Sequence, residues 1–473
     1  MISKIETWIR TREVILIILA LVVLLRIPSL FEPYWYGDEG IYLTVGRAMR
    51  QGVELYRGIY DNKPPLIYTL AVVADGKQFW FKFILMLWGV ATVAVFWNVS
   101  RCRVWPTAIF ALLTTLPLLE GNIANAELFF LLLTVGAFGL VWKDDSLKNI
   151  FGAGILYGVA GLFKTPGLLE AAVWPTIWLV SRDKEWLKKS GWMGVGAAIP
   201  MGLAAIYFLG RGTLPEFITA AGVKMIPYLS SWNVNLPVVG TLWGRAILLV
   251  SWLVGLWLVR RKIPRTVVIM GVWWGITLFA ALLSGRPYPH YLLQMVPVVS
   301  LAVGAMLWKE KKGKLVWLAM AGVTIAAVVG FKFYVYPVVS YYQNWGKWVL
   351  GQQSHEAYMQ WFNPQVKNNY EIAKFIKAGS GRDERIFVWG DEPMIYALSR
   401  RLPATKYTVE YHVKEFGAQK ATGEKLKEMR PRYVVFWGDG ENLPGLAELL
   451  KEEYILETKV GEAQVYRLFG HRL

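Results

Sequence analysis

The sequence predicts a polytopic α-helical membrane protein with a small α/β domain at its C-terminal end. Hydrophobic residues make up 55 % of the 473 residues and charged residues only 18 %, which is too apolar for a soluble protein of this length. Apolar runs near bilayer length, roughly 20 residues for a helix, recur from residue 13 to residue 336. From Pro337 onward the hydropathy falls and the apolar runs shorten.

Apolar runs of roughly 15 to 22 residues predict about eleven transmembrane helices. They cover residues 13–30, 79–99, 104–119, 125–142, 149–163, 166–181, 191–209, 241–259, 265–284, 288–308 and 315–336. The stretch from Pro64 to Ala74 is too short to span a bilayer and is followed by Asp75, Gly76 and Lys77. We therefore predict a juxtamembrane or re-entrant helix there.

Basic residues predict the orientation of these helices, because Lys and Arg collect in cytoplasmic loops. They fall at alternate connections: Lys4 to Arg12, Arg101 and Arg103, Lys143 and Lys148, Arg182 to Lys189, Arg260 to Arg265, and Lys309 to Lys314. The sequence thus predicts a plasma-membrane protein with a cytoplasmic N-terminus and an extracytoplasmic C-terminal domain, residues 337–473. The first apolar run lacks a small-residue cleavage site, so we expect it to remain as an anchor.

The net charge of +17 does not indicate nucleic acid. From Pro337 to the end there are 19 Lys and Arg against 17 Asp and Glu, which leaves +15 for the membrane module, residues 1–336. This excess is typical of membrane topology and of affinity for anionic membrane lipids. Cys102 is the one cysteine, which excludes an intramolecular disulfide and any Cys-based metal cluster.

The first predicted outer loop, residues 31–78, is the most charged part of the membrane module. It contains Asp38 and Glu39, the amphipathic segment with Arg47, and then Asp61, Asn62 and Lys63. Pro64 and Pro65 hold Lys63 in an extended or turn conformation before the next helix. So many charges beside hydrocarbon suggest a functional site; the alternative is a solvated loop.

Other outer loops add polar residues, and we expect them to converge on one cavity. They are Glu120, Asn122, Asn125, Glu127, Lys164, Lys224, Tyr228, Trp232, Arg286, His290, Tyr291 and Gln294. Each has a plainer alternative: Lys164 could extend to the interface, Glu127 could favour a helix N-terminus, Arg286 could bind lipid headgroups, and His290 could be structural.

The C-terminal region predicts a compact α/β domain. Residues 385–390 and 431–438 are typical of buried strands, with helices near 367–378, 391–400, 412–429 and 444–453 and a closing pair at 454–460 and 463–469. Gly-Asp follows both buried strands, at Gly390-Asp391 and Gly438-Asp439. These pairs indicate either a ligand-binding edge or ordinary turns.

The ordered set of Asp38-Glu39, Lys63-Pro64-Pro65, Pro289-His290-Tyr291 and a trailing α/β domain resembles the GT-C glycosyltransferases. The resemblance is to the protein O-mannosyltransferase-like and aminoarabinose lipid A transferase-like branch. It implies a polyprenyl-phosphate sugar donor, transfer on the outer face, Asp38 as acceptor-activating base with Glu39 beside it, and Lys63 on the lipid phosphate. Lys164 and His290 also match positions of the family. Asn62 departs from it, because the aminoarabinose enzymes have a Glu there that serves a metal.

The chemistry of such a transfer agrees with these residue types. A carboxylate can take the proton of the attacking hydroxyl, and Lys or Arg can stabilise the departing phosphate, with inversion at the anomeric carbon. We predict Asp38 and Glu39 as catalytic residues, Lys63, Lys164 and Arg286 as donor-phosphate contacts, and further substrate contacts at Arg47, Asp61, Glu127, His290, Tyr291 and Gln294.

Two questions stay open in the sequence. A divalent metal bound by Asp38 or His290 is one, and no other cofactor is indicated. The other is the class of protein. The first interpretation is an enzyme with a hydroxyl-bearing acceptor. The alternatives are a transporter or flippase of lipid-linked substrates, or a non-catalytic lipid- or glycan-binding protein on the same fold. Transporters usually show internal repeats and charges near the midplane. Neither is visible here, which favours the enzyme.

Overall fold

The computed structural model describes residues 12–226, 229, 236, 239–307, 313–437 and 443–469. The chain divides into two compact units. Unit 1 comprises Met1–Ile27, Leu85–Leu214 and Ala221–Val338, and unit 2 comprises Pro28–Ile84, Pro215–Ala220 and Val339–Leu473. Residues 28–84 of the predicted membrane module thus belong with the C-terminal domain in one unit.

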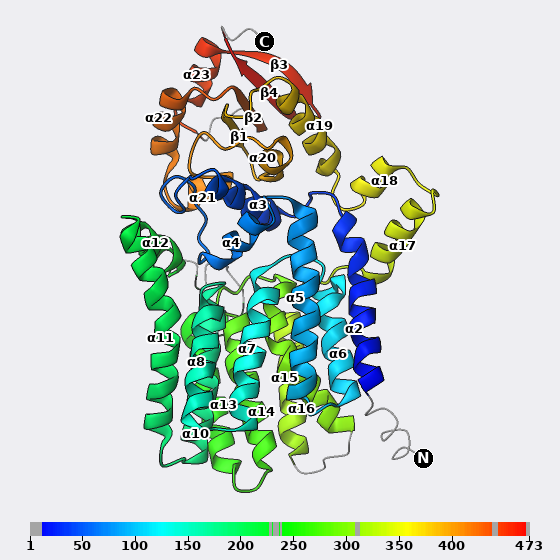
Figure 1. The fold of residues 1–473 in the computed structure, drawn as a ribbon, viewed down its shortest axis with the longest axis vertical. Coiled ribbons are helices and arrows are strands. Elements are labelled where there is room, and N and C mark those ends of the chain that lie inside the picture. The colour runs from blue at the N-terminus through cyan, green and yellow to red at the C-terminus, as the bar shows by residue number, and fades with distance from the viewer. Residues whose placement is uncertain are drawn as a thin grey trace. The chain divides into compact units, whose positions relative to one another are not determined.

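Unit 1 is helical (Figure 1). Its α-helices are α2 (Arg12–Arg26), α6 (Val104–Thr115), α7 (Ala126–Lys143), α8 (Leu147–Gly161), α9 (Thr165–Leu169), α10 (Val173–Ser181), α11 (Trp186–Gly210), α13 (Leu242–Val259), α14 (Arg265–Ala281), α15 (Val296–Leu307) and α16 (Lys314–Gly330). Its 3₁₀ helices are η2 (Pro117–Leu119), η3 (Glu170–Ala172), η4 (Val223–Met225) and η5 (Pro289–Met295). The division between the units falls within η1 (Ile27–Phe31), α5 (Gln78–Val99) and α12 (Leu214–Ala221), and after the first residue of α17 (Val338–Val349).

Each of the eleven predicted segments contains helix, but their lengths differ. Six helical stretches in the described part of the chain are long and apolar enough to cross a membrane: Glu13–Phe31, Gln78–Val99, Ala126–Lys143, Trp186–Gly210, Leu242–Val259 and Pro289–Met306. Three shorter apolar helices are α6, α14 and α16. The predicted segment 166–181 is divided into α9, η3 and α10. A multi-pass membrane protein follows from these helices, and the number of eleven crossings stays a prediction.

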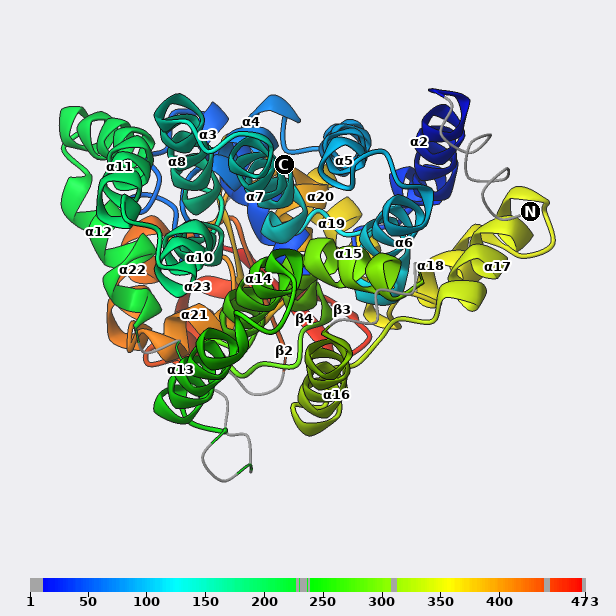
Figure 2. The ribbon, with the colours of Figure 1, turned by 90° about the horizontal axis from the view of Figure 1, so that it is seen from below.

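Close packing within unit 1 depends on small residues. Helix α8 lies between α7 and α11, as Figure 2 shows end-on. A Cβ atom on Gly154 would lie 2.2 Å from the carbonyl oxygen of Met193, and one on Gly158 would lie 2.4 Å from that of Ala197. Glycine lets the two helix backbones approach closely, which is the usual way for helices to associate in a bilayer.

The orientation of the helices is open to a labelling test. We expect a cysteine at Lys188, in a predicted cytoplasmic loop, and one at Lys451, in the C-terminal domain, to react from opposite sides of the membrane in a Cys102→Ser background. Both positions are exposed. The measurement is modification of intact cells by a membrane-impermeant maleimide, with permeabilised cells as the control. Labelling of both positions in intact cells would contradict the predicted topology.

Unit 2 combines a sheet with short helices. Its helices are α3 (Gly37–Arg50), α4 (Leu66–Val73), α17 (Val338–Val349), α18 (His355–Gln360), α19 (Gln365–Ala378), α20 (Met394–Ser399), α21 (Glu410–Glu415), α22 (Gln419–Met429) and α23 (Leu446–Glu453). Its strands are β1 (Ile386–Trp389), β2 (Tyr433–Trp437), β3 (Tyr454–Val460) and β4 (Ala463–Leu468). They pair in the order β1-β2-β4-β3, with β1 parallel to β2 and the other neighbours antiparallel.

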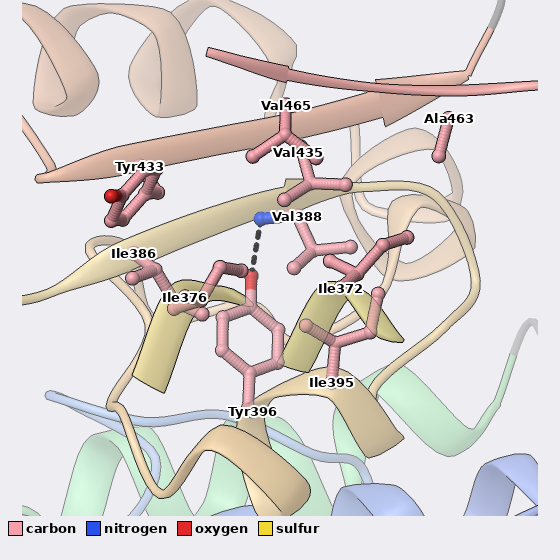
Figure 3. Close-up of a cluster of buried hydrophobic side chains, with 10 residues drawn as sticks. All are labelled: Ile372, Ile376, Ile386, Val388, Ile395, Tyr396, Tyr433, Val435, Ala463 and Val465. Atoms are coloured by element: carbon pink, nitrogen blue, oxygen red, sulfur yellow. Dashed lines mark hydrogen bonds between the residues drawn. The ribbon is translucent and has the colours of Figure 1, made fainter. Parts of the chain in front are cut away.

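The core of this sheet explains its sequence pattern. All four residues of β1 are buried, as the continuous apolar run predicts for a strand covered on both faces. Figure 3 shows Tyr396 of α20 rising into a cluster of apolar side chains from α19, β1, β2 and β4, where its hydroxyl accepts a hydrogen bond of 2.7 Å from the amide of Val388. This bond gives the phenol oxygen a partner inside an apolar core.

Two details of the predicted C-terminal domain need correction. A single helix over 412–429 is wrong: α21 and α22 are separate, because Gly417 adopts a left-handed φ of 61° between them. The short helices α17 and α18 were not predicted, because the hydropathy falls after Pro337 and no apolar run marks them. After β1, the Asp391 carboxylate accepts the amide hydrogen of Tyr411 in the first turn of α21, and the choice between a ligand-binding edge and an ordinary turn stays open. Gly438 and Asp439 lie outside the described residues.

The segment after Lys63 forms α4, which has only eight residues. At about 1.5 Å of rise per residue it is far shorter than the roughly 30 Å of hydrocarbon in a bilayer. The prediction of a helix here that does not span therefore agrees with the length of α4. Helix α4 packs against α3, where a Cβ atom on Gly46 would lie 2.5 Å from that of Ala71.

Candidate functional site

The acidic pair of the first loop lies in the first turn of α3. Carboxylates are stabilised there because the helix dipole presents its positive end. Successive residues of a helix point about 100° apart, so Asp38 and Glu39 face different surroundings. Asp38 faces Lys63, while Glu39 is buried with Lys82.

Lys63 is held between two carboxylates in unit 2. Its Nζ lies 3.4 Å from Asp38 Oδ2 and 3.6 Å from Asp61 Oδ2. The ammonium also lies 5.0 Å from the centre of the Tyr42 ring. Of the three charged side chains, Asp38 is 27 % exposed, Lys63 is 12 % exposed and Asp61 is fully buried. Asp38 is therefore the carboxylate of this cluster that an incoming molecule can reach.

Tyrosines fix the geometry of the cluster. The Tyr42 hydroxyl donates to Asp38 Oδ2 at 3.0 Å, from one turn further along α3. The Tyr68 hydroxyl donates to Asp61 Oδ2 at 2.7 Å and accepts the amide hydrogen of Lys63 at 3.2 Å. Burial, and next the charge of Asp61, raises the pKa of Tyr68 well above its ordinary value, so this phenol keeps its proton. The Tyr56 hydroxyl donates to the carbonyl of Lys63 at 2.8 Å.

His412 belongs to the same cluster, and sequence reasoning missed it. Its Nε2 lies 3.5 Å from Asp61 Oδ1, although about 350 residues separate the two in the chain. Its Nδ1 is buried and has no hydrogen-bond partner among the described residues. Burial lowers the pKa of His412, against the opposing charge of Asp61, so the ring is neutral at pH 7. Nothing in the local pattern of α21 marks this histidine as functional.

The buried His412 predicts a stability that falls in mild acid. The folded pKa is below the ordinary value of 6.5, so below about pH 6.5 the unfolded chain binds more protons here than the folded chain does. Stability contributed at neutral pH is lost as the pH falls through this window, by at most about 1.4 kcal/mol per pH unit. We expect the melting temperature to fall less from about pH 7 to 5.5 in His412→Gln than in the wild type. The exposed His355→Gln is the control; an equal fall in all three proteins would contradict the assignment.

Glu39 is part of a buried ion cluster. Lys82 Nζ lies 2.5 Å from Glu32 Oε2 and 3.3 Å from Glu39 Oε2, and all three side chains are at most 1 % exposed. The Tyr341 hydroxyl donates to Glu32 Oε1 at 2.5 Å. A catalytic role for Glu39 stays a prediction. The burial of Glu39 beside Lys82 favours a structural role instead, in which the ion pair stabilises the position of α3. The sequence did contain a signal for this cluster, because Lys82 is a charged residue within a strongly apolar run, and such residues usually pair with an opposite charge.

Four of the predicted residues gather in unit 1, around a cavity of about 200 Å³. Glu127, Lys164, Tyr291 and Gln294 line it together with apolar residues that include Met225, Ile226, Leu229 and Leu283. Lys164 Nζ lies 2.5 Å from Glu127 Oε1 and 4.4 Å from the centre of the Tyr291 ring. A charged pair in the lining of a mainly apolar cavity suits a ligand with a polar head and an apolar body.

His290 lies beside this group with a different partner. Its Nδ1 is 2.5 Å from Glu120 Oε2, which also accepts a hydrogen bond of 2.7 Å from the Asn125 amide. Glu120 has a left-handed φ of 60° at the end of η2, which turns its side chain toward η5. Arg286 is half-buried, and its amide donates to the Ser284 hydroxyl. Tyr228 and Trp232 lie outside the described residues.

Among the residues that the structure describes, no group of three or more His, Cys, Asp or Glu side chains is arranged to hold a metal ion. Asp38 pairs with Lys63 in unit 2, and His290 pairs with Glu120 in unit 1. A metal at either residue stays an open prediction.

Comparison with known proteins finds solved structures with a similar fold. No protein-family model matches the chain, and no curated protein matches its sequence. A structure of ArnT from Cupriavidus metallidurans bound to undecaprenyl phosphate is similar over 96 % of this chain and 98 % of that one, with 15 % identity and a TM-score of 0.60. The apo state of the same protein gives 14 % identity and a TM-score of 0.57, covering 95 % and 97 % of the two chains. An Archaeoglobus fulgidus oligosaccharyltransferase in complex with Zn and sulfate gives 14 % identity and a TM-score of 0.45, covering 92 % and 71 %.

The likeness to ArnT covers almost the full length of both chains, so the two share a fold. The fold that the motif resemblance implied is therefore confirmed. The low identity means that the activity has to be argued from the site residues of this chain.

Proposed function

We propose that the protein is a membrane glycosyltransferase that moves a sugar from a polyprenyl-phosphate donor to a hydroxyl-bearing acceptor on the extracytoplasmic face. The observation that carries this proposal is the Asp38–Lys63 pair, in which a partly exposed carboxylate lies 3.4 Å from an ammonium group. The shared fold with a protein crystallised with undecaprenyl phosphate supports the choice of donor.

In this proposal Asp38 takes the proton of the acceptor hydroxyl. The freed oxygen attacks the anomeric carbon, the bond from that carbon to the phosphate oxygen breaks, and the lipid phosphate leaves with the electron pair. A general base is worth about 10²–10⁴-fold in rate. The ammonium of Lys63 stabilises the charge that develops on the leaving phosphate. One displacement gives inversion at the anomeric carbon.

The remaining residues have supporting roles in this proposal. Asp61, held by Tyr68 and close to His412, positions Lys63 rather than touching the sugar, because it is fully buried. Lys164 and Arg286 are proposed as further contacts to the donor phosphate. Glu127, Tyr291 and Gln294 line the cavity that would receive part of a lipid-linked substrate.

Loss of Lys63 is expected to weaken donor binding as well as turnover, because a positive charge on the phosphate acts in both the ground and the transition state. A hydrogen bond to a charged group contributes about 1.5–3 kcal/mol, so Lys63→Ala should bind polyprenyl phosphate roughly 10- to 100-fold more weakly. The measurement is mass spectrometry of the lipid that co-purifies with each protein, followed by titration with undecaprenyl phosphate in detergent.

The matched control is Lys188→Ala, which removes an exposed lysine with one exposed partner. A folded Lys63→Ala protein with unchanged affinity for undecaprenyl phosphate would remove Lys63 from the donor site. Absence of bound polyprenyl phosphate from the wild type, even after titration, would count against the proposed donor itself.

A further inference from the structure

A cationic cluster surrounds Asp75 in unit 2 and shares no residue with the Asp38–Lys63 pair. The Asp75 carboxylate lies 3.2 Å from Arg50 Nε, 3.0 Å from Lys77 Nζ and 3.1 Å from an Arg400 guanidinium nitrogen. These cations come from the end of α3, the turn after α4, and the end of α20. Asp75 and Gly76 both have left-handed φ values, 53° and 60°, which bend the chain so that the groups meet.

Arg47 adds a fourth cation to this cluster. It precedes Arg50 by three residues, so both lie on the same face of α3. Its Nε is buried and has no hydrogen-bond partner among the described residues. Burial lowers the pKa of Arg47, and the nearby charge of Arg400 lowers it further, so the cations of this cluster repel one another. One carboxylate against four cations leaves a net charge of +3.

The cluster lies in the chain directly before a helix that can cross a membrane, which indicates a lipid headgroup as its anion. Lys77 directly precedes Gln78, the first residue of α5, which is long and apolar enough to cross a membrane. Val73 is 67 % exposed and Trp80 is 50 % exposed, on either side of Lys77 in the chain. Exposed apolar and Trp side chains beside basic ones are typical of the layer where hydrocarbon meets lipid headgroups.

We propose that Arg47, Arg50, Lys77 and Arg400 bind the phosphate of an anionic membrane lipid at the outer end of α5. The planar guanidinium groups of arginine suit phosphate oxygens, and the lysine adds a point charge. Asp75 orients the cations and competes with the lipid for them. The site takes a phosphodiester headgroup, and its acyl chains lie along the apolar start of α5.

The test uses the full-length protein in a neutral detergent, titrated with phosphatidylglycerol and, separately, phosphatidylcholine, with bound lipid counted by native mass spectrometry. Each basic residue near an anionic surface contributes roughly fivefold in affinity, so Arg50→Gln/Lys77→Gln should bind phosphatidylglycerol about 10- to 30-fold more weakly. Binding of phosphatidylcholine should be unchanged. The control Lys184→Gln/Lys188→Gln removes two exposed cations from another loop and should keep full affinity.

The variant Asp75→Asn distinguishes a lipid-binding site from a network of ion pairs that only stabilises the turn. It removes the competing carboxylate, so the proposal expects tighter binding of phosphatidylglycerol, whereas a purely structural network gives a lower melting temperature and unchanged binding. Equal loss in the double variant and its control, or full competition by inorganic phosphate at millimolar concentration, would overturn the proposal. The readouts require no sugar transfer, so this test is independent of the proposed function.

Discussion

Asp38→Asn is expected to reduce sugar transfer by roughly two to four orders of magnitude, because the amide keeps the size of the side chain but cannot take a proton. Donor lipid should still bind, since Lys63 remains. The fold should survive as well, because Asp38 is partly exposed and the Tyr42 hydroxyl can donate to the amide oxygen. The measurement is transfer from a polyprenyl-phosphate sugar to an acceptor, with folding checked by thermal melting.

Glu54→Gln is the matched control for Asp38→Asn. It removes a carboxylate from the same loop, where Glu54 makes an exposed ion pair with Arg57. Exposed pairs of this kind contribute little to stability, so turnover should stay near that of the wild type. Near-normal turnover in Asp38→Asn would reject Asp38 as the base. Misfolding of that variant would instead assign Asp38 a structural role.

Lys82→Met is expected to destabilise the protein by about 3–5 kcal/mol, which is the usual effect of removing one partner from a buried ion pair. Lys82 is the cation between Glu32 and Glu39, and all three side chains are buried. Methionine fills a similar volume but leaves two carboxylates without their counter-charge. Thermal melting and the yield of folded protein measure the effect.

A second substitution distinguishes lost charge from lost packing in this cluster. Glu39→Gln by itself should be tolerated, because Lys82 keeps Glu32 as its partner. Combined with Lys82→Met it should recover part of the stability, since one buried negative charge is removed. The exposed Lys188→Met is the control for a change of lysine to methionine. If Lys82→Met melts like the wild type, the buried cluster does not support α3.

The resemblance stated from the motifs was confirmed as a fold, while the assignment of roles needed tertiary structure. Asp38 and Glu39 are neighbours in the sequence and were predicted together as catalytic residues. In the structure they have separate environments, one partly exposed beside Lys63 and the other buried beside Lys82. Adjacent residues of a helix point about 100° apart, and a sequence pattern does not show which of the two faces the core.

Sequence alone determined that the chain is a multi-pass membrane protein, that strands and helices of a small sheet follow near the C-terminal end, and that Asp38 and Lys63 belong to one charged loop. It could do so because bilayer length, strand alternation and proline geometry are local properties of the chain. Tertiary structure decided that Asp61 is buried against His412, that Lys82 joins Glu32 to Glu39, and that Arg400 meets Asp75. Those contacts join residues distant in the chain, and they depend on how α3, α5, α20 and α21 pack, which local periodicity does not encode.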